Sequence, residues 1–468
     1  MTGKTYCEPA RQIPITYDND VIVCGGGVTG CAAALSAALG GARVRLVERN
    51  GVLGGVATAG LMANITNMFM TYHGVTVVKG IPEAIIERMV AEGGTRPNWH
   101  RAELPGIVID PEIFKLVLTD MLKEAGVEVL LHAMTVGVIK EGNRVRGVIL
   151  ESKSGREAAM AANVIDATGD SDVVHYAGAP YRMETADGSM EFRLANVDMD
   201  KAVAYFGEHR EHFPTDVDYV RNYDSFERNW REYGFYFVPH GLGATFKPWV
   251  DAVERGEYKA KDGEWYGLNV FGMYGLRGDG TVVINSNFHH ISSMDVREFT
   301  RVEMEARRMC HRAAEFLRTH LPGFENAKLI ATAEDWGQRV TRWIDGRQTL
   351  TKQDAQAGRK WGEVIGRAPF KEPDEPVCGF EIPYGVMVPR DVDGLLAPSG
   401  KTISTNPRAM IRGMSFCMTL GEAAGVAAAL GARQGLPAGD VTIRDIQRQL
   451  VKQGAYLGDP ERLAELGL

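Results

Sequence analysis

The segment from Asp20 to Glu48 constrains the fold most, because one short run combines a strand, a glycine-rich turn, a helix and a second strand that ends in an acid. Gly25, Gly27 and Gly30 give the turn its G-x-G-x-x-G spacing. In this motif the first glycine permits a tight turn, the second lets the backbone approach a pyrophosphate, and the third lets the helix pack on the sheet. The helix N-terminus faces the anion, and the acid accepts hydrogen bonds from a ribose diol. The segment therefore predicts a dinucleotide site.

The composition is that of an acidic, folded chain. It has 468 residues, 45% of them hydrophobic, and a formal net charge of -8. This charge, with no offsetting run of Lys and Arg, argues against a nucleic-acid partner. No apolar run approaches the roughly 18 residues of a membrane span and no leader pattern begins the chain, so we expect a cytoplasmic protein. The six cysteines form no C-x-x-C pair. No His, Asp and Glu cluster has metal spacing, so neither a disulfide scaffold nor a bound metal is expected.

The remaining pattern predicts an α/β fold in which a Rossmann-like nucleotide-binding domain carries an inserted α+β domain. Asp110, Pro111 and Glu112 supply an N-cap, a first-turn proline and a first-turn acid, which together begin a helix. Tryptophans and tyrosines concentrate in the middle of the chain, where a mixed sheet is expected. We expect the nucleotide domain at 17–180, a substrate or cap domain at 181–377, and the C-terminal part of the nucleotide domain at 378–468. Expected helices are 81–91, 110–125, 297–321 and 414–432, and expected strands are 127–131, 135–140, 144–151 and 158–166.

Two later segments indicate which dinucleotide is bound. The run from Asp166 to Asp170 ends a strand and brings the backbone back toward the nucleotide. The run from Val392 to Lys401 precedes a helix rich in glycine and alanine and gives a third approach. NAD dehydrogenases rarely need the chain to return twice, so this organisation favours FAD.

With these segments the chain resembles the bacterial FAD-dependent oxidoreductases within the glutathione-reductase-like flavoproteins, and more distantly the fumarate reductase flavoproteins. The matching motifs span about Asp20 to Leu457. The resemblance implies an FAD-binding domain of the glutathione reductase type. It also implies FAD contacts from Gly25, Gly27, Val28, Thr29, Gly30, Glu48, Arg49, Gly54, Gly55, Val136, Ala167, Thr168, Gly169, Asp170, Gly400, Lys401, Arg412 and Gly421.

The C-terminal motif carries one departure and one open choice. Relatives tend to have Ala-Gly-Arg where this chain has Ser399 to Lys401, so a point charge replaces a bidentate arginine. Arg412 precedes the helix that begins at about Met414, and adds positive charge where hydride transfer leaves negative charge on the flavin. Gly421 lies further along this helix. It could pass under the pyrimidine edge of the flavin, permit close packing on the sheet, or do both.

The catalytic candidates are an arginine and three histidines. Arg339 is a candidate clamp for a substrate carboxylate or hydroxyl, and on a strand Arg342 would face the other way and pair with an acid. His289 and His290 end an expected strand, and His73 follows the loop that leaves the nucleotide domain. Histidine titrates near neutral pH and is a natural general base. For each histidine the alternative is a structural hydrogen bond.

Three functions remain open at this point. The leading one is an FAD-dependent dehydrogenase or oxidase that removes hydride from a small polar metabolite and passes the electrons to oxygen or an external carrier. The second is a reductase of a C=C or C=O bond, with an arginine as proton donor. The third is a flavin-binding protein without catalysis. Disulfide reductases are disfavoured, because Val56 to Ala59 stand where they carry a redox cysteine pair. The chain could also form a homo-oligomer.

Overall fold

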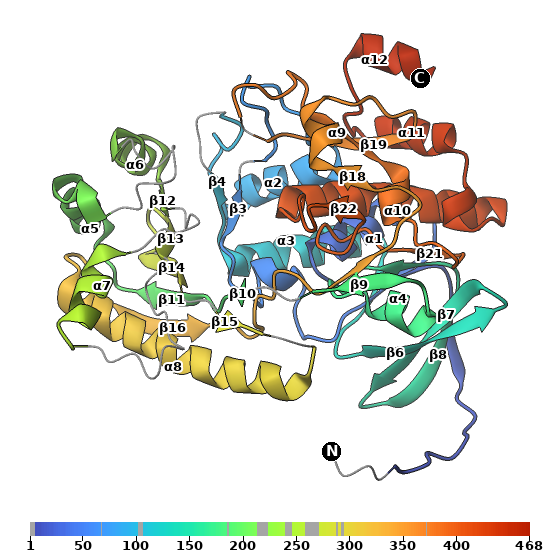
Figure 1. Ribbon diagram of the computed structural model, residues 1–468, viewed down its shortest axis with the longest axis horizontal. Coiled ribbons are helices and arrows are strands. Elements are labelled where there is room, and N and C mark those ends of the chain that lie inside the picture. The colour runs from blue at the N-terminus through green and yellow to red at the C-terminus, as the bar shows by residue number, and fades with distance from the viewer. Residues whose placement is uncertain are drawn as a thin grey trace.

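The computed structural model describes most of the chain. The described residues are 5–66, 68–101, 106–184, 187–212, 223–238, 246–257, 271–286, 289–291, 294–370 and 372–468, with the backbone alone for 187, 223–225, 271, 286, 289 and 290. Two units lie side by side, one around a parallel sheet on the right of Figure 1 and one around an antiparallel sheet on the left.

A seven-stranded sheet organises the larger unit. Its path runs β5-β2-β1-β8-β7-β6, and β21 pairs with β8. The pairs among β5, β2, β1, β8 and β21 are parallel, whereas β7 is antiparallel to both β8 and β6. The strands are β1 (Ile15–Cys24), β2 (Val44–Val47), β5 (Glu128–Leu130), β6 (Met134–Glu141), β7 (Arg144–Ser152), β8 (Gly155–Asp166) and β21 (Leu395–Leu396). The Rossmann-like α/β core expected from the sequence is therefore present.

The register of the three central strands fixes where a ligand can bind. Cys24 at the end of β1 pairs with Val47 of β2 on one side and with Asp166 of β8 on the other. The carboxyl ends of these strands consequently share one edge of the sheet. In open α/β sheets ligands bind outside this edge. The glycine-rich turn, the acid Glu48 and the loop after β8 all lie there.

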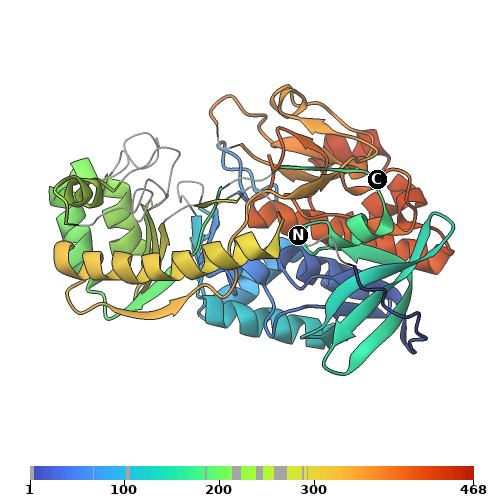
Figure 2. The same cartoon turned by 60° about the horizontal axis from the view of Figure 1, so that its bottom comes forward.

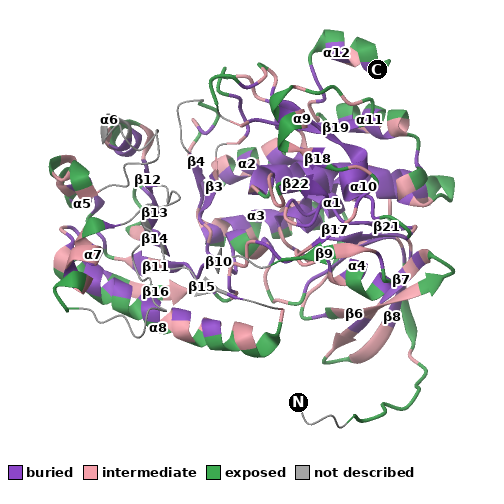
Figure 3. Ribbon diagram, in the orientation of Figure 1, coloured by how far each residue is buried: buried purple, intermediate pink, exposed green. Residues whose placement is uncertain are grey.

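Helices α1 and α10 pack against each other in the core of this unit (Figure 3), where both are largely buried. A Cβ on Gly421 would lie 2.2 Å from the carbonyl oxygen of Thr29, and a Cβ on Gly425 equally close to that of Ala33. Only glycine permits this approach of two helix backbones. The helices of this unit are α1 (Val28–Leu39), α2 (Ile81–Ala91), α3 (Pro111–Glu124), α4 (Asp172–Ala177), α9 (Lys352–Gln356), α10 (Met414–Gln434), α11 (Ile443–Lys452) and α12 (Pro460–Leu466).

One expectation from composition needs correction. Helix α10 is 21 residues long and apolar enough to span a membrane by length and composition, whereas no segment was expected to reach that length. All of its most apolar window is buried inside the molecule. Within the described residues it is therefore the central core helix of the parallel-sheet unit.

The second unit is a five-stranded sheet in the order β12-β13-β14-β11-β16, and all of its pairs are antiparallel rather than mixed. Helix α8 lies along it and extends toward the larger unit (Figure 2). A buried stripe with helical period, Val302, Ala306, Cys310, Ala313 and Leu317, joins α8 to the core of the sheet. The elements are β11 (Phe192–Ala195), β12 (Phe235–Val238), β13 (Phe271–Leu276), β14 (Thr281–Ser286), β16 (Lys328–Thr332), α5 (Met199–Glu208), α6 (Tyr223–Arg228), α7 (Lys247–Glu254) and α8 (Val296–His320).

Five short strand pairs complete the fold, and three of them show how the chain passes between the units. Val108 of β4 packs with Phe235 and Phe237 of the second sheet, so β3 and β4 bridge the units. Leu350 of β18 and Ile365 of β19 belong to the core of the larger unit, so the chain has returned there well before residue 377. The pairs are β3 (Asn64–Thr66) with β4 (Gly106–Val108), β9 (Tyr181–Met183) with β17 (Arg342–Ile344), β10 (Asp187–Gly188) with β15 (His289–His290), β18 (Leu350–Thr351) with β22 (Thr405–Asn406), and β19 (Val364–Ala368) with β20 (Phe380–Pro383).

Candidate functional site

A cavity of about 1060 Å³ opens at the carboxyl edge of the parallel sheet. Its lining comes from both units: the glycine-rich turn, the loops after β2 and β8, the N-terminal half of α8, the segment before β17 and the start of α10. Ligand cavities in proteins usually measure about 300–1,000 Å³, so this one is large enough for an extended cofactor and a substrate.

The glycine-rich turn forms one wall of the cavity. Gly25 has φ +101°, and a Cβ there would lie 2.3 Å from the carbonyl oxygen of Ala167. Gly27 is different, because the nearest atom to its Cβ position, in Gly55, is 4.0 Å away. Gly27 caps α1 without a side-chain hydrogen bond. The first backbone N–H groups of α1 therefore border open space, as an anion site at a helix N-terminus requires.

Glu48 is held against this turn by the backbone. Its Oε2 accepts a hydrogen bond from the Gly26 N–H at 2.6 Å, and its Oε1 accepts one from the Asn50 N–H at 2.7 Å. The side chain is buried yet lines the cavity. The two backbone bonds fix the carboxylate at the end of β2, where the sequence predicts a ribose contact.

The loop after β8 is organised by a buried acid. Asp166 accepts hydrogen bonds from the backbone and hydroxyl of Thr168 and from the Val174 N–H. Burial raises the pKa of Asp166 to about 6 despite these bonds. The loop places Asp170 in the cavity wall, where its Oδ1 accepts hydrogen bonds from Lys401 Nζ and from the Thr341 hydroxyl, both at 2.8 Å. Burial alone would raise the pKa of Asp170, but Lys401 and Thr341 hold it below its ordinary value.

Positive side chains line the cavity from several directions. Arg49 pairs with Asp335 of the segment before β17 at 3.2 Å, which links the two units at the cavity. Arg412, just before α10, has a pKa below its ordinary value because protein surrounds its guanidinium. The residue as a whole is exposed and lines the cavity. Cys417, one turn into α10, also lines the cavity and contacts the carbonyl oxygen of Arg412.

Most of the residues that the resemblance assigns to FAD border this cavity. They are Gly25, Gly27, Val28, Thr29, Glu48, Arg49, Gly55, Ala167, Thr168, Gly169, Asp170, Lys401 and Arg412. Gly30, Gly54, Val136, Gly400 and Gly421 do not line it. A Cβ on Gly30 would lie 1.8 Å from the Gly25 carbonyl oxygen, and one on Gly400 would lie 2.3 Å from that of Ile411. These two glycines permit close packing, as Gly421 does against α1, and a flavin contact by Gly421 stays a prediction.

None of the three histidines proposed as catalytic residues is placed in the cavity lining by the described part of the structure. His73 lies on an exposed turn, where its Nε2 is hydrogen-bonded to the Glu375 carbonyl oxygen at 3.1 Å, outside the cavity lining. The structure therefore does not bring His73 to the cavity. The backbone of His289 and His290 forms β15, but their side chains lie outside the described part of the chain, so a role for them stays a prediction.

Arg339 and Arg342 both line the cavity, contrary to the expectation that they face opposite ways. The strand begins only at Arg342, so the alternation of a strand does not apply to Arg339. Arg342 NH1 donates to the carboxylate of Asp172 at 2.8 Å and to the carbonyl oxygen of Asp170 at 3.0 Å. Its partner is thus the N-terminal turn of α4.

Sequence reasoning missed three buried polar side chains that line the cavity: Glu191, Asn285 and Asn64. Each has one oxygen without a hydrogen-bond partner among the described residues, namely Glu191 Oε2, Asn285 Oδ1 and Asn64 Oδ1. Burial raises the pKa of Glu191 well above its ordinary value, an effect that the nearby Arg339 only partly offsets. The one signal in the sequence was an acid placed directly before the apolar strand Phe192–Ala195.

Comparisons with known proteins agree with this site. The family model described as FAD dependent oxidoreductase matches residues 20–450. Digeranylgeranylglycerophospholipid reductase 2 of Methanothermobacter thermautotrophicus is 29% identical over 199 residues, which cover 40% of this chain and 50% of that protein. Thiamine thiazole synthase of Aeropyrum pernix is 34% identical over 132 residues, which cover 28% of this chain and 43% of that protein. The chain thus spans at most about half the length of these curated relatives.

One solved structure similar over most of the chain is a geranylgeranyl bacteriochlorophyll reductase-like protein of Thermoplasma acidophilum. It covers 96% of this chain and 87% of its own, with 15% sequence identity and a TM-score of 0.44.

Proposed function

This chain belongs to the family of FAD dependent oxidoreductases and is therefore an enzyme that uses FAD, and we propose that it reduces a polarised double bond with Glu191 as the proton donor. The observation that carries the proposal is a buried carboxyl in the cavity wall that has one unpartnered oxygen and whose pKa is raised well above its ordinary value by burial. Its substrate would be a small molecule that bears a carbonyl or carboxylate beside the double bond.

The residues at the sheet edge fit FAD in the extended form of the glutathione reductase type. The open space at Gly27 and the uncapped N-terminus of α1 suit the pyrophosphate. Glu48 would accept hydrogen bonds from the adenosine ribose, and Arg412 with the start of α10 would face the flavin. When bound, FAD supplies or accepts the hydride equivalent. The residues of the chain supply position, charge and the proton.

The wall opposite the glycine turn would bind the substrate. Arg339 supplies positive charge for a carboxylate or carbonyl oxygen, and Asn285 is fixed because its Nδ2 donates to the Tyr274 hydroxyl at 3.2 Å. That bond leaves Asn285 Oδ1 to accept a hydrogen bond from a ligand. Glu191 would hold the proton on its carboxyl group and deliver it to the carbon that becomes C–H. Such proton transfer contributes about 10²- to 10⁴-fold to a rate.

We infer the direction of the reaction from the protonation state of the Glu191 carboxyl in this wall. Removal of hydride from a substrate is assisted by a deprotonated base, whereas burial raises the pKa of Glu191 well above its ordinary value and so favours the protonated acid. The reductase named among the relatives supports the same direction. The dehydrogenase alternative depends on His289 and His290, whose side chains lie outside the described residues. We therefore favour the reductase. A cytoplasmic location and a homo-oligomeric state stay predictions.

The direct experiment uses the purified protein with FAD under anaerobic conditions. Protein reduced with dithionite is mixed with α,β-unsaturated acids and carbonyl compounds, and the return of the oxidised flavin absorbance is followed. The proposal expects at least one of these compounds to reoxidise the flavin. Bleaching of the oxidised flavin by a saturated acid, alcohol or amine, with no reoxidation by any unsaturated compound, would establish the dehydrogenase instead.

A further inference from the structure

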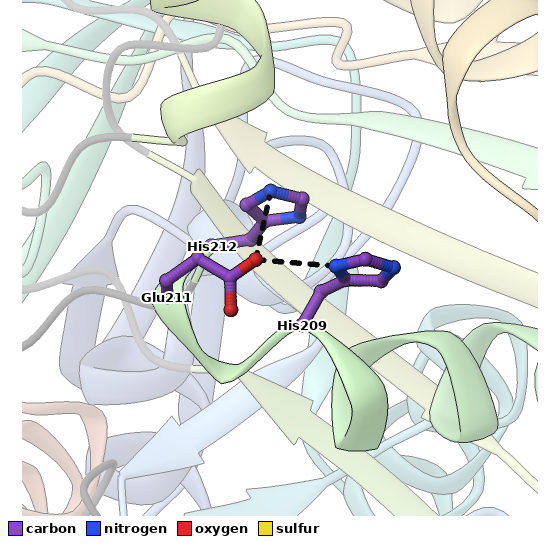
Figure 4. Close-up of side chains that lie close together, drawn as sticks. All are labelled: His209, Glu211 and His212. Atoms are coloured by element: carbon purple, nitrogen blue, oxygen red, sulfur yellow. Dashed lines mark hydrogen bonds and ion pairs between the residues drawn. The ribbon is translucent and has the colours of Figure 1, made fainter.

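Two histidines and a glutamate gather at the end of α5, on the second unit (Figure 4). His209 follows the helix, and Glu211 and His212 lie in the short turn after it. Glu211 Oε1 lies 3.1 Å from His209 Nδ1 and 3.6 Å from His212 Nε2. One atom from each side chain, three in all, lie within 4.8 Å of one another. None of the three residues lines the cavity.

These spacings match those between the ligands of a small divalent ion. Zn²⁺ binds imidazole nitrogen and carboxylate oxygen at about 2.0–2.2 Å, so the ligand atoms of a tetrahedral site lie about 3.3–3.5 Å apart. The distances from Glu211 Oε1 to His209 Nδ1 and to His212 Nε2 lie on either side of that value. Three ligands leave the fourth position of a tetrahedral site free. Water can reach this position, because Glu211 is exposed and His209 is half-buried.

The outer hydrogen bond of His212 supports the same interpretation. Its Nδ1 lies 3.0 Å from the Tyr205 hydroxyl, which comes from the preceding helix α5. A metal on Nε2 leaves the proton on Nδ1, and this N–H donates a hydrogen bond to the Tyr205 hydroxyl oxygen. Metal-ligating histidines almost always donate their second ring N–H in this way, which fixes the ring orientation. The rings of His209 and His212 are also stacked, with an interplanar angle of 8° and centroids 5.1 Å apart.

We propose that His209, Glu211 and His212 form a binding site for a divalent metal ion of the zinc class, separate from the flavin cavity. Imidazole and carboxylate ligands suit Zn²⁺, with Co²⁺ and Ni²⁺ as substitutes. The sequence expectation that no cluster has metal spacing is corrected, since positions i, i+2 and i+3 converge only because the helix ends at His209. An ion here would fix the end of α5 to the turn after it. This proposal does not depend on the direction of the flavin reaction.

The test uses the FAD-loaded full chain without an affinity tag. Calorimetric titration with ZnCl₂ should show one equivalent bound with a micromolar dissociation constant. Titration with CoCl₂ should give the visible absorption of a nitrogen- and oxygen-ligated Co²⁺ ion. The variants Glu211→Gln and His212→Asn should each weaken binding about 100-fold, and Tyr205→Phe about 10-fold, as outer-partner mutations do.

His311→Asn on α8 is the matched control, because His311 is an exposed histidine outside the cluster, and it should bind Zn²⁺ as the wild type does. A wild-type protein that takes up no stoichiometric Zn²⁺ and gives no Co²⁺ spectrum would overturn the proposal. Unchanged affinity in His212→Asn would overturn it as well, since the ion would then bind elsewhere and the cluster would be an ordinary set of hydrogen bonds.

Discussion

Glu191 and Glu422 are both buried carboxyls with a raised pKa, yet they belong to regions with different architecture. Glu191 is 3% exposed and lines the cavity at the start of the antiparallel sheet. Glu422 is 1% exposed on α10, where it lies against Gly80 and away from the cavity lining. Burial is the largest cause of the raised pKa in both. A perturbed pKa alone therefore does not identify a reactive group. Access to a ligand cavity separates the two.

The surroundings of the two carboxyls also differ in how closely they are packed and in whether they border the cavity. Around Glu422 the helices α1 and α10 approach so closely that only glycine fits at the contacts. Glu191 Oε2, Asn285 Oδ1 and both carboxylate oxygens of Glu422 have no hydrogen-bond partner among the described residues, but only Glu191 and Asn285 line the cavity. A buried polar atom without a partner costs about 1–3 kcal/mol. We infer that the first region is built for packing and for holding the nucleotide, and the second for a substrate.

The largest expected effect concerns the packed region. Gly25→Ala combines φ +101° with a Cβ 2.3 Å from a backbone oxygen, so the turn must deform. We expect this variant to lose FAD on purification, measured by its flavin absorbance. Gly362→Ala is the control, because its Cβ position has no atom within 4 Å and its φ is not left-handed. Retention of FAD by Gly25→Ala would show that the turn does not hold the nucleotide.

The next effect tests the cavity region. Glu191→Gln keeps the size of the side chain and removes the transferable proton, so flavin reoxidation by the substrate should slow about 100-fold or more while FAD stays bound. In the wild type the protonated carboxyl is the active form, so the rate should fall as pH rises through the raised pKa, and the variant should lack this fall. Glu305→Gln, at a half-buried position of α8 outside the cavity lining, should behave as the wild type does. An unchanged rate in Glu191→Gln would remove the residue from the mechanism.

A third prediction tests the structural role of Glu422 through the pH dependence of the free energy of unfolding. The pKa of Glu422 is raised from 4.5 to about 8 in the folded chain. Between these pH values ionisation of Glu422 stabilises the unfolded chain, whereas the folded chain keeps the carboxyl protonated. The free energy of unfolding should therefore fall between these pH values, by up to about 1.4 kcal/mol per pH unit. Glu422→Gln should remove this slope in urea unfolding and leave turnover intact. Glu315→Gln, on the surface of α8, should keep the slope.

The smallest effect concerns the charge pair between Lys401 and Asp170 in the cavity wall. Lys401→Met removes the cation beside Asp170, so the pKa of Asp170 should rise and FAD affinity should fall about tenfold. Lys401→Arg keeps the charge and should bind FAD within a few-fold of the wild type. Flavin fluorescence titration measures both. Equal affinity in Lys401→Met would place the pair outside the FAD site.

The nucleotide region could be predicted from the sequence because its determinants are local. The Gly25–Gly30 turn, the N-cap Asp110 and the first-turn Pro82 act within a few residues. The helices expected at 81–91 and 110–125 lie within one residue of those limits. The role of Gly421 was less clear, since close packing and a flavin contact both call for glycine. The position of α1 shows the packing contact, and the flavin contact stays a prediction.

The cavity wall could not be predicted, because it is assembled from distant parts of the chain. Glu191, Asn285 and Arg339 are brought together by antiparallel pairing between β11, β14 and their neighbours. No local pattern marks a buried acid as reactive. The expectation that Arg339 and Arg342 alternate failed because the segment before Arg342 is irregular rather than a strand.

The central claim is that Glu191 carries a proton in the resting enzyme at neutral pH. Infrared difference spectroscopy between the wild type and Glu191→Gln, both with FAD bound, tests this directly. The account predicts a protonated-carboxyl C=O band in the wild type that shifts in D₂O and disappears in the variant. A carboxylate band in its place would show that Glu191 is ionised, and the proposed direction of the reaction would then be wrong.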